Sequence, residues 1–229
     1  MLEVNNLTMG YNQAMVLHEV SLKVNPGEQV FVVGRNGAGK TSLLKSLSGL
    51  IKPRSGSITF NGESVAGLPA EKVAQKGLRF VAQDKKVFAS LSVRNNLALA
   101  AHAAGIDLKD AIAQAVSIYP KLEEFMELKA GNLSGGQREI LLIGRAMVGS
   151  PKLLMIDEPT EGLAAVVIDD IFRILSDIRG TTSTIIVEQN LSVVTRLADR
   201  IYVMKEGKLI KEFDNHDQSV ETADLEVFL

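Results

Sequence analysis

One short segment of the sequence constrains the fold more than any other. Residues 34–41 read GRNGAGKT, which fits the pattern G-x-x-x-x-G-K-[ST], and they follow the hydrophobic run 29–33 and precede a run with helical spacing. Glycines let successive backbone N–H groups surround phosphate oxygens, and the N-terminus of the next helix adds partial positive charge. Lys40 would reach the β- and γ-phosphates, and the Thr41 hydroxyl would ligate Mg²⁺. The segment therefore predicts a loop that binds the phosphates of ATP or GTP.

A second segment has the pattern of a strand that ends in acids. Residues 153–158 read LLMIDE, so a buried strand would deliver Asp157 to the Mg²⁺ side of the phosphates. The adjacent Glu158 is then placed to polarise a water molecule for in-line attack on the γ-phosphorus. The alternative is a strand that merely ends in two solvated acids, and the phosphate-binding loop makes that alternative the weaker one. We therefore predict Asp157 as a metal ligand and Glu158 as a catalytic carboxylate.

The composition places the chain among ordinary globular proteins. Of its 229 residues 46% are hydrophobic and 23% charged, and the formal net charge of −2 argues against a nucleic-acid partner. Because cysteine is absent and the three histidines are scattered, we expect neither disulfides nor a transition-metal site built on thiolates or imidazoles. No stretch approaches the ~20 apolar residues of a membrane-spanning helix, and the start lacks the pattern of a signal peptide. These features lead us to expect a cytoplasmic protein.

Hydrophobic periodicity predicts an alternation of strands and helices. The expected strands are residues 2–8, 16–24, 29–33, 57–60, 78–82, 152–156, 184–188 and 201–205, with a tight turn at Asn61-Gly62. The expected helices are residues 40–50, 96–104, 109–117, 138–148, 166–178 and 191–199. Alternation of this kind predicts an α/β core, into which the alanine-rich segment from residue 92 to about 129 inserts a helical subdomain.

A third motif lies between the first two. Residues 133–137 read LSGGQ and precede a helix-compatible run, and this combination matches the signature of ABC ATPases. The chain resembles an ABC transporter ATP-binding subunit over essentially its whole length. The resemblance implies a P-loop NTPase (RecA-like) α/β core, an antiparallel β subdomain and an inserted α-helical subdomain, which together make the ABC ATPase fold. It implies a single nucleotide-binding domain over residues 1–229. The core would occupy about 1–86 and 150–229, and the helical signature subdomain about 87–149.

Further positions match this family or depart from it. Tyr11 matches the aromatic residue that stacks on adenine, and Gln83 matches the Q-loop glutamine near the Mg²⁺ and the attacking water. The plain alternatives are a packed surface tyrosine and a polar loop residue. Ala164 stands where the loop after the acidic strand commonly has aspartate, and Gln189 stands in place of the switch histidine. Because Gln189 can hydrogen-bond a γ-phosphate but cannot carry imidazolium charge, we expect slower and less pH-sensitive turnover.

Short strings favour one branch of the family. The strings EPTEGLA (158–164), VEQN (187–190), LIKPRSGSI (50–58) and GLP (67–69) are similar to those in ATP-binding subunits of importers for branched-chain amino acids, urea or short-chain amides. The resemblance implies ATP hydrolysis that energises transport of such a small polar solute through separate membrane subunits. A lipid-extracting or exporter-type subunit and a soluble scaffold-type ABC ATPase stay open as alternatives.

The resemblance also implies that two ATP-binding subunits, identical copies or paralogues, associate head to tail and clamp ATP and Mg²⁺ between them. In one chain the nucleotide would contact Tyr11, Gly34, Arg35, Asn36, Gly37, Ala38, Gly39, Lys40, Thr41 and Ser42, and in the other Ser134, Gly135, Gly136 and Gln137. The Mg²⁺ ligands would be Thr41, Gln83 and Asp157, and the catalytic residues Glu158, Gln189 and Gln83.

Membrane partners are implied as well. Integral membrane permease subunits would dock near Gln83 and the segment 87–104, and a periplasmic or extracellular solute-binding protein would be an indirect partner. The chain would then be peripheral on the inner face of the cell membrane. Residues 214–229 are too short for a regulatory domain, and we expect them to pack as a terminal helix.

Overall fold

Two β-sheets organise the fold. The computed structural model describes residues 1–84 and 86–229; position 85, inside the predicted core segment 1–86, lies outside the described residues. The main sheet has the strand order β10-β9-β3-β8-β7-β6, parallel except for the antiparallel pair of β10 and β9. Its strands are β3 (Gln29–Val33), β6 (Leu78–Val81), β7 (Leu153–Asp157), β8 (Ser183–Glu188), β9 (Arg200–Lys205) and β10 (Lys208–Asp214). The second sheet is antiparallel and consists of β2 (Ala14–Val24), β1 (Leu2–Tyr11), β4 (Ser55–Phe60) and β5 (Glu63–Ser64).

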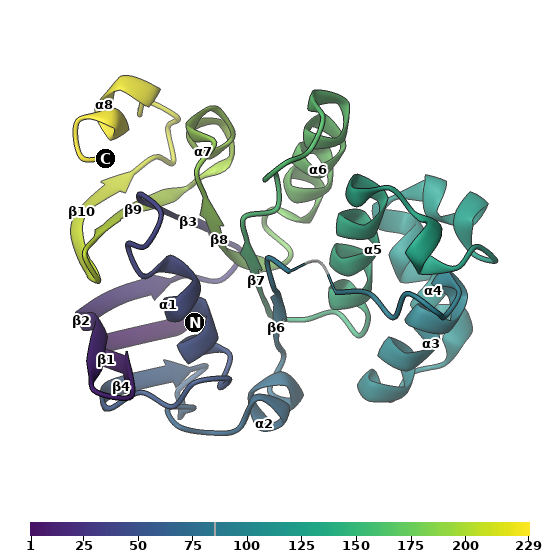
Figure 1. Cartoon of the computed structure of the whole chain (residues 1–229), viewed down its shortest axis with the longest axis horizontal. Coiled ribbons are helices and arrows are strands. Elements are labelled where there is room, and N and C mark those ends of the chain that lie inside the picture. Colours follow the sequence, from purple (N-terminus) through teal and green to yellow (C-terminus); the bar gives the residue numbers. More distant parts are fainter. Residues whose placement is uncertain (85) are drawn as a thin grey trace.

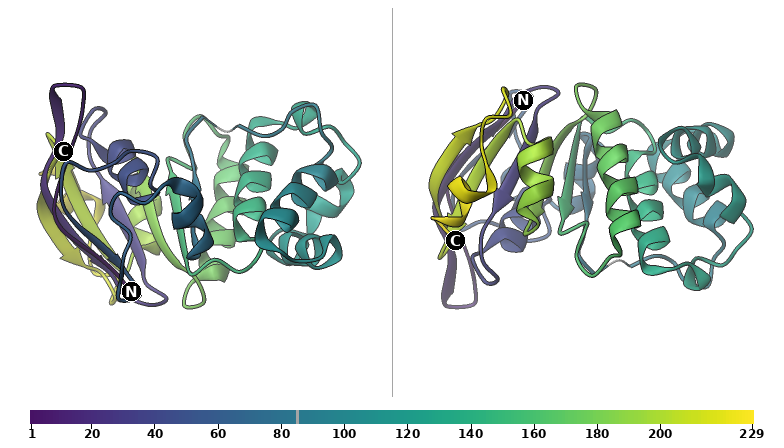
Figure 2. Two further views of the ribbon diagram at one scale, coloured as in Figure 1. Left: turned by 90° about the horizontal axis from the view of Figure 1, so that it is seen from below. Right: turned by 90° about the horizontal axis from the view of Figure 1, so that it is seen from above.

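The helices form separate groups around the main sheet (Figure 1). They are α1 (Lys40–Leu47), α2 (Ala70–Gln75), α3 (Val93–Ala104), α4 (Leu108–Ile118), α5 (Gly135–Met147), α6 (Ala165–Ile178), α7 (Leu191–Leu197) and α8 (Thr222–Glu226), with short 3₁₀ turns at Pro120–Phe125 and Ala130–Asn132. Helices α3, α4 and α5 gather at the end of the molecule farthest from β1 and β2, as both views of Figure 2 show. Among the described residues, no helix combines the length and the apolar character needed to cross a bilayer.

The central strands β3, β7 and β8 of the main sheet are buried on both faces because each contains a continuous apolar run. Phe31 and Val33 of β3 pack with the helices α3 to α7, whereas Val30 and Val32 pack with the antiparallel sheet and α1. The same alternation holds along β7, β8 and β9. Two hydrophobic cores therefore meet at this sheet and hold it rigid, and the edge of a rigid sheet is a fixed platform for a site.

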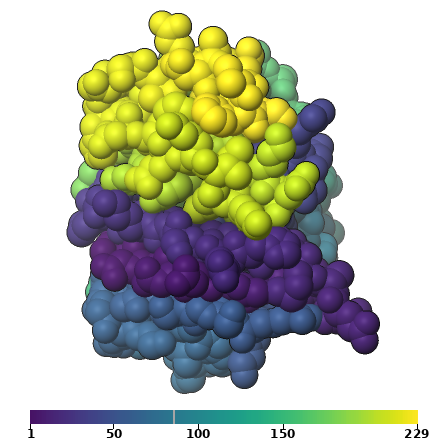
Figure 3. Space-filling view, turned by 90° about the vertical axis from the view of Figure 1, so that its left-hand side faces the viewer, coloured from purple at the N-terminus to yellow at the C-terminus, as the bar shows by residue number. Residues whose placement is uncertain are grey.

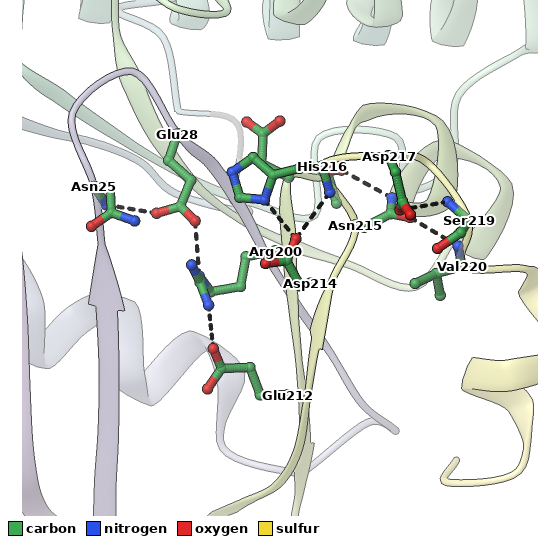
Figure 4. Close-up of polar contacts among 12 residues, drawn as sticks. Asn25, Glu28, Arg200, Glu212, Asp214, Asn215, His216, Asp217, Ser219 and Val220 are labelled. Atoms are coloured by element: carbon green, nitrogen blue, oxygen red, sulfur yellow. Dashed lines mark hydrogen bonds and ion pairs between the residues drawn. The ribbon is translucent and has the colours of Figure 1, made fainter.

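The first and last parts of the chain share one face of the molecule. Figure 3 shows the N-terminal strands in purple beside the C-terminal segment in yellow, and the N–H of His18 donates to the carbonyl of Gly207 at 2.9 Å. Beneath this face the guanidinium of Arg200 pairs with Glu28 at 2.8 Å and with Glu212 (Figure 4). This ion-pair cluster joins the amino end of β3 to β9 and β10, so it stabilises the end of the sheet opposite the sequence motifs.

The structure confirms the predicted α/β fold class and most of the predicted elements. The Asn61-Gly62 turn is present, with φ values of +51° and +85°. The prediction missed β10, an exposed edge strand whose charged sequence has no β pattern of its own. Among the described residues it pairs with β9 alone. The prediction of a terminal helix over 214–229 was wrong in extent, because only α8 is helical there.

Candidate active site

The glycine-rich motif and the acidic motif lie at the carboxyl ends of neighbouring parallel strands. β3, β8 and β7 are neighbours in the main sheet. The segment 34–41 follows β3, Glu158 follows β7 and Gln189 follows β8. Since parallel strands end at the same edge of a sheet, the topology brings the glycine-rich loop, the acidic pair and Gln189 together.

The glycine-rich loop keeps an open backbone in front of α1. Gly37 and Gly39 have φ values of +81° and +108°, in the left-handed region that favours glycine. Gly34 has a different constraint, because a Cβ there would lie 2.3 Å from the carbonyl oxygen of Met204. Gly39 caps α1 without a side chain, so the first N–H groups of α1 are left for an anion.

Lys40 is buried and points back along the loop. Its Nζ donates to the carbonyl oxygens of Gly34 at 2.7 Å and Arg35 at 3.2 Å, and lies 3.6 Å from Oε1 of Glu158. These contacts hold a positive charge at the floor of the loop, where a phosphate oxygen would meet it.

Two side-chain amides hold the carboxylate of Glu158. Gln189 Nε2 donates to Oε1 at 2.7 Å, and Gln83 Nε2 donates to Oε2 at 3.0 Å. The same nitrogens reach further, from Gln189 to Asn36 Oδ1 at 2.8 Å and from Gln83 to Glu161 Oε2 at 2.8 Å. Glu158 is 5% exposed and has a φ of +51°, a strained value for a residue other than glycine. The structure thus brings the three predicted catalytic residues into one hydrogen-bonded group.

Asp157 is buried at the same edge with its charge uncompensated by hydrogen bonds. Neither carboxylate oxygen has a hydrogen-bond partner in the part of the chain that the structure describes. Burial raises the pKa of Asp157; the nearby Thr41 hydroxyl and Lys40 oppose that rise, and the negative charge of Glu158 adds to it. A buried carboxylate of this kind is costly unless a cation binds it, and oxygen donors such as these suit Mg²⁺. The residues present therefore fit a divalent cation.

Tyr11 lies at the rim of the site. It ends β1, is 45% exposed, and its hydroxyl lies 3.4 Å from Oγ of Ser42 in the first turn of α1. The contact holds the half-exposed ring beside the glycine-rich loop, and an aromatic ring there could stack on a planar ligand.

The signature residues lie elsewhere. α5 packs against β6, α3 and α4, and β6 is three strands away from β3 in the main sheet. Ser134 and Gln137 form a capping box, in which Ser134 Oγ accepts from the Gln137 N–H at 3.2 Å and Gln137 Oε1 accepts from the Ser134 N–H at 2.8 Å. Ser134 and Gly135 are exposed, whereas Gly136 is buried. Within one chain the structure leaves these residues apart from the glycine-rich loop.

Sequence reasoning missed two carboxylates next to the predicted residues. Glu161 binds Gln83, as described above, and the buried Glu188 accepts hydrogen bonds from Thr160, Gln189 and Asn190. The available signal for Glu188 was a charged residue at the end of a continuous apolar strand, directly before Gln189.

Sequence comparison relates the chain to known proteins. The family model described as ABC transporter matches residues 17–161. The high-affinity branched-chain amino acid transport ATP-binding protein BraG of Pseudomonas aeruginosa is 38% identical over 212 residues, covering 92% of this chain and 91% of that protein. BraF, a second branched-chain amino acid transport ATP-binding protein of the same organism, is 32% identical over 225 residues, covering 90% and 88%.

Structural comparison agrees. The solved structure of an ATP-binding subunit of an ABC transporter matches with a TM-score of 0.87 at 25% identity, covering 99% of this chain and 98% of that one. This similarity confirms the predicted ABC ATPase fold. The chain belongs to the ABC transporter family and is one of its nucleotide-binding ATPase cassettes.

Proposed function

We propose that the chain is the ATP-hydrolysing subunit of an importer for branched-chain amino acids or a related small polar solute. The observation that carries the ATPase chemistry is the buried carboxylate of Glu158, held by Gln83 and Gln189 beside Lys40. The solute class is supported by the names of BraG and BraF. Urea and short-chain amides stay within the proposal because the strings EPTEGLA (158–164) and VEQN (187–190) also resemble the ATP-binding subunits of importers for those solutes.

Each residue of the site receives a role. The N–H groups of the glycine-rich loop, Lys40 and the first turn of α1 bind the phosphates, and Tyr11 stacks on adenine. Glu158 accepts the proton of the attacking water, and the amide of Gln189 binds the γ-phosphate oxygen that gains charge. The left-handed backbone of Glu158 and its two amide contacts keep that carboxylate in one orientation before nucleotide binds.

Mg²⁺ is part of the proposal because the unpartnered oxygens of Asp157 need a cation. Thr41, Gln83 and Asp157 would hold the ion, which would neutralise charge on the β- and γ-phosphates. The proposal gives the Asp157 carboxylate the task of holding the ion, because neither of its oxygens has a hydrogen-bond partner among the described residues.

We infer that a second cassette completes the site. Ser134 and Gly135 are exposed at the start of α5, on the far side of the sheet from α1, so this end of the helix is open to a nucleotide on another chain. The presence of both BraG and BraF in one organism supports a partner that is a paralogue rather than an identical copy. Ala164 adds no carboxylate to such an interface.

We infer further that membrane subunits dock in a groove between β6 and the helical group. The groove has a volume of ≈ 280 Å³, and its lining includes Arg79, Asp84, Lys86, Ala100, Leu142 and Arg145. Burial lowers the pKa of Arg145, whose Nε and Nη1 have no hydrogen-bond partner among the described residues, while its guanidinium lies 5.0 Å from the ring of Phe88. An acidic side chain of the membrane partner would offset the positive charge of this half-buried guanidinium. Docking there keeps the chain on the inner face of the membrane.

Recovery of the tagged chain from detergent-solubilised native membranes tests this proposal. We expect two multi-span proteins and a second ATP-binding chain to copurify, and a panel of branched-chain amino acids, urea and amides then identifies the solute. Arg145→Glu is expected to lower recovery of the multi-span proteins at least about tenfold without loss of nucleotide binding. The matched control is Arg173→Glu on α6, where the side chain is 70% exposed. A soluble partner without any membrane protein would contradict the proposal.

A further inference from the structure

A buried carboxylate joins the loops that carry Glu158 and Gln189. Glu188, at the end of β8, is 2% exposed. Its Oε1 accepts hydrogen bonds from the N–H of Thr160 at 3.0 Å and from the hydroxyl of Thr160 at 2.6 Å. Its Oε2 accepts from the N–H groups of Gln189 at 2.7 Å and Asn190 at 2.9 Å. A buried carboxylate is stable only where hydrogen bonds replace water, and here all four donors belong to the loops that follow β7 and β8.

These hydrogen bonds close a ring that includes Glu158. Two residues after Glu158 the chain reaches Thr160, which binds Glu188; the next residue, Gln189, returns its amide to Glu158 Oε1 at 2.7 Å. A shorter link crosses the ring, because the N–H of Glu158 donates to the carbonyl of Val187 at 2.9 Å. Every link is covalent or a hydrogen bond, so the carboxylate of Glu158 and the amide of Gln189 are fixed relative to each other.

We propose that Glu188 is a positioning residue for ATP hydrolysis. It fixes the start of the loop after β8, and so aims the amide of Gln189 at Glu158 and at Asn36 of the glycine-rich loop at the same time. Glu188 acts through Gln189 and not on the nucleotide, since both of its oxygens are occupied by protein donors. The inference rests on the proposed roles of Glu158 and Gln189.

The first test separates turnover from binding. In Glu188→Gln only one end of the side chain accepts hydrogen bonds, so at least one loop N–H faces an NH₂ group. We expect kcat to fall about tenfold while KM for ATP and the affinity for ADP stay within about twofold. The matched control is Asp199→Asn, which removes another buried carboxylate at the opposite end of the sheet, where Asp199 accepts from the N–H of Gln29 at 2.8 Å. That control is expected to lower Tm and leave kcat unchanged.

The second test asks whether Glu188 acts through Gln189. On a Gln189→Ala background, Glu188→Gln is expected to lower kcat by less than about twofold more. Thr160→Val removes one donor and is expected to slow turnover, whereas Thr160→Ser keeps the hydroxyl and restores the wild-type kcat. A full additional loss on the Gln189→Ala background would overturn the proposal.

The third test needs no activity. Residue-resolved amide exchange on the full chain without nucleotide is expected to quicken in Glu188→Gln at Gln189 or Asn190 or at Thr160, while the N–H of Glu158, bound to Val187, keeps its protection. An unchanged kcat, or unchanged exchange at all three amides, would overturn the proposal. If Glu158→Gln alone left hydrolysis intact, the role of Glu158 would fail, and the exchange measurement would still decide whether Glu188 fixes the loop.

Discussion

At the scale of single residues, the buried carboxylate of Asp157 destabilises the folded chain, and the same carboxylate is the proposed ligand of Mg²⁺. Burial raises its pKa in the folded chain, so folding favours the protonated form. The contribution of Asp157 to the free energy of unfolding is therefore most favourable below the ordinary carboxyl pKa. This contribution is lost as the pH rises through the raised pKa of Asp157 in the folded chain. At neutral pH the nucleotide-free chain therefore carries an unfavourable charge at this position.

Asp157→Asn is expected to stabilise the chain without nucleotide. Removal of the buried charge should raise Tm at pH 7 by about 3 °C, or about 1 kcal/mol, and the gain should shrink as the pH is lowered. Mg²⁺-dependent ATP hydrolysis should be lost in the same variant. Thermal unfolding with and without Mg²⁺ and ATP checks both effects, and a lower Tm at pH 7 without nucleotide would contradict the assignment.

Gln189→His tests the departure from the family's histidine. A histidine there would lie next to the carboxylate of Glu158, which raises an imidazole pKa from its ordinary value of about 6.5. We expect faster turnover and a new step in kcat between about pH 6 and pH 8, absent from the wild type. Gln75→His on the surface of α2 is the control. An unchanged kcat and pH profile in Gln189→His would contradict the expectation that Gln189 makes turnover slower and less sensitive to pH.

At the scale of elements, the contact between α5 and α6 explains one signature glycine. A Cβ on Gly136 would lie 2.4 Å from Cγ1 of Val167, whereas the nearest atom to a Cβ on Gly135 is Cδ2 of Leu163 at 3.9 Å. Gly136→Ala is therefore expected to lower the free energy of unfolding by about 2 kcal/mol, because Val167 is stiff and cannot move aside. The double variant Gly136→Ala with Val167→Ala should recover most of the lost free energy of unfolding. Gly135→Ala should have the free energy of unfolding of the wild type. Denaturant unfolding of the three variants checks this; equal stability of Gly136→Ala and wild type would refute it.

Elements with a local signal were predictable from the sequence. β3 lies at the predicted residues 29–33 because an unbroken apolar run and the glycine-rich loop define both of its ends. β10 and the extent of α8 were not predictable from the sequence, because they depend on contacts with other parts of the chain. β10 is held by β9, and the segment between β10 and α8 is held by the buried side chain of Asn215, whose amide donates to the carbonyls of Thr195 and Ala198.

The residues of the site also differ in whether the sequence predicts them. Lys40, Asp157 and Glu158 were predictable because each stands in a short motif whose chemistry fixes its neighbours. Glu188 was not, because its partner Thr160 is 28 positions away and meets it only when β7 and β8 pair. The predicted residues stand in local motifs, whereas the contact of Glu188 with Thr160 depends on the pairing of β7 with β8.

At the scale of the whole molecule, the arrangement leaves the site incomplete. The glycine-rich loop lies where α1 enters between the sheets, and the signature residues lie with the helical group beyond β6 (Figure 1). A nucleotide bound in one chain therefore presents its outer face to solvent or to another cassette. The proposed second chain would turn ATP into a contact between subunits, and hydrolysis would remove that contact.

Glu158→Gln is the most direct test of the central claim, that this carboxylate drives ATP hydrolysis in the assembled cassette pair. The change removes the base but keeps the size of the side chain, so ATP affinity should stay within about twofold while single-turnover hydrolysis falls at least about 100-fold. Nucleotide recovered from the isolated complex should then be ATP, and the two cassettes should stay associated. Hydrolysis at the wild-type rate, with ADP recovered, would contradict the account.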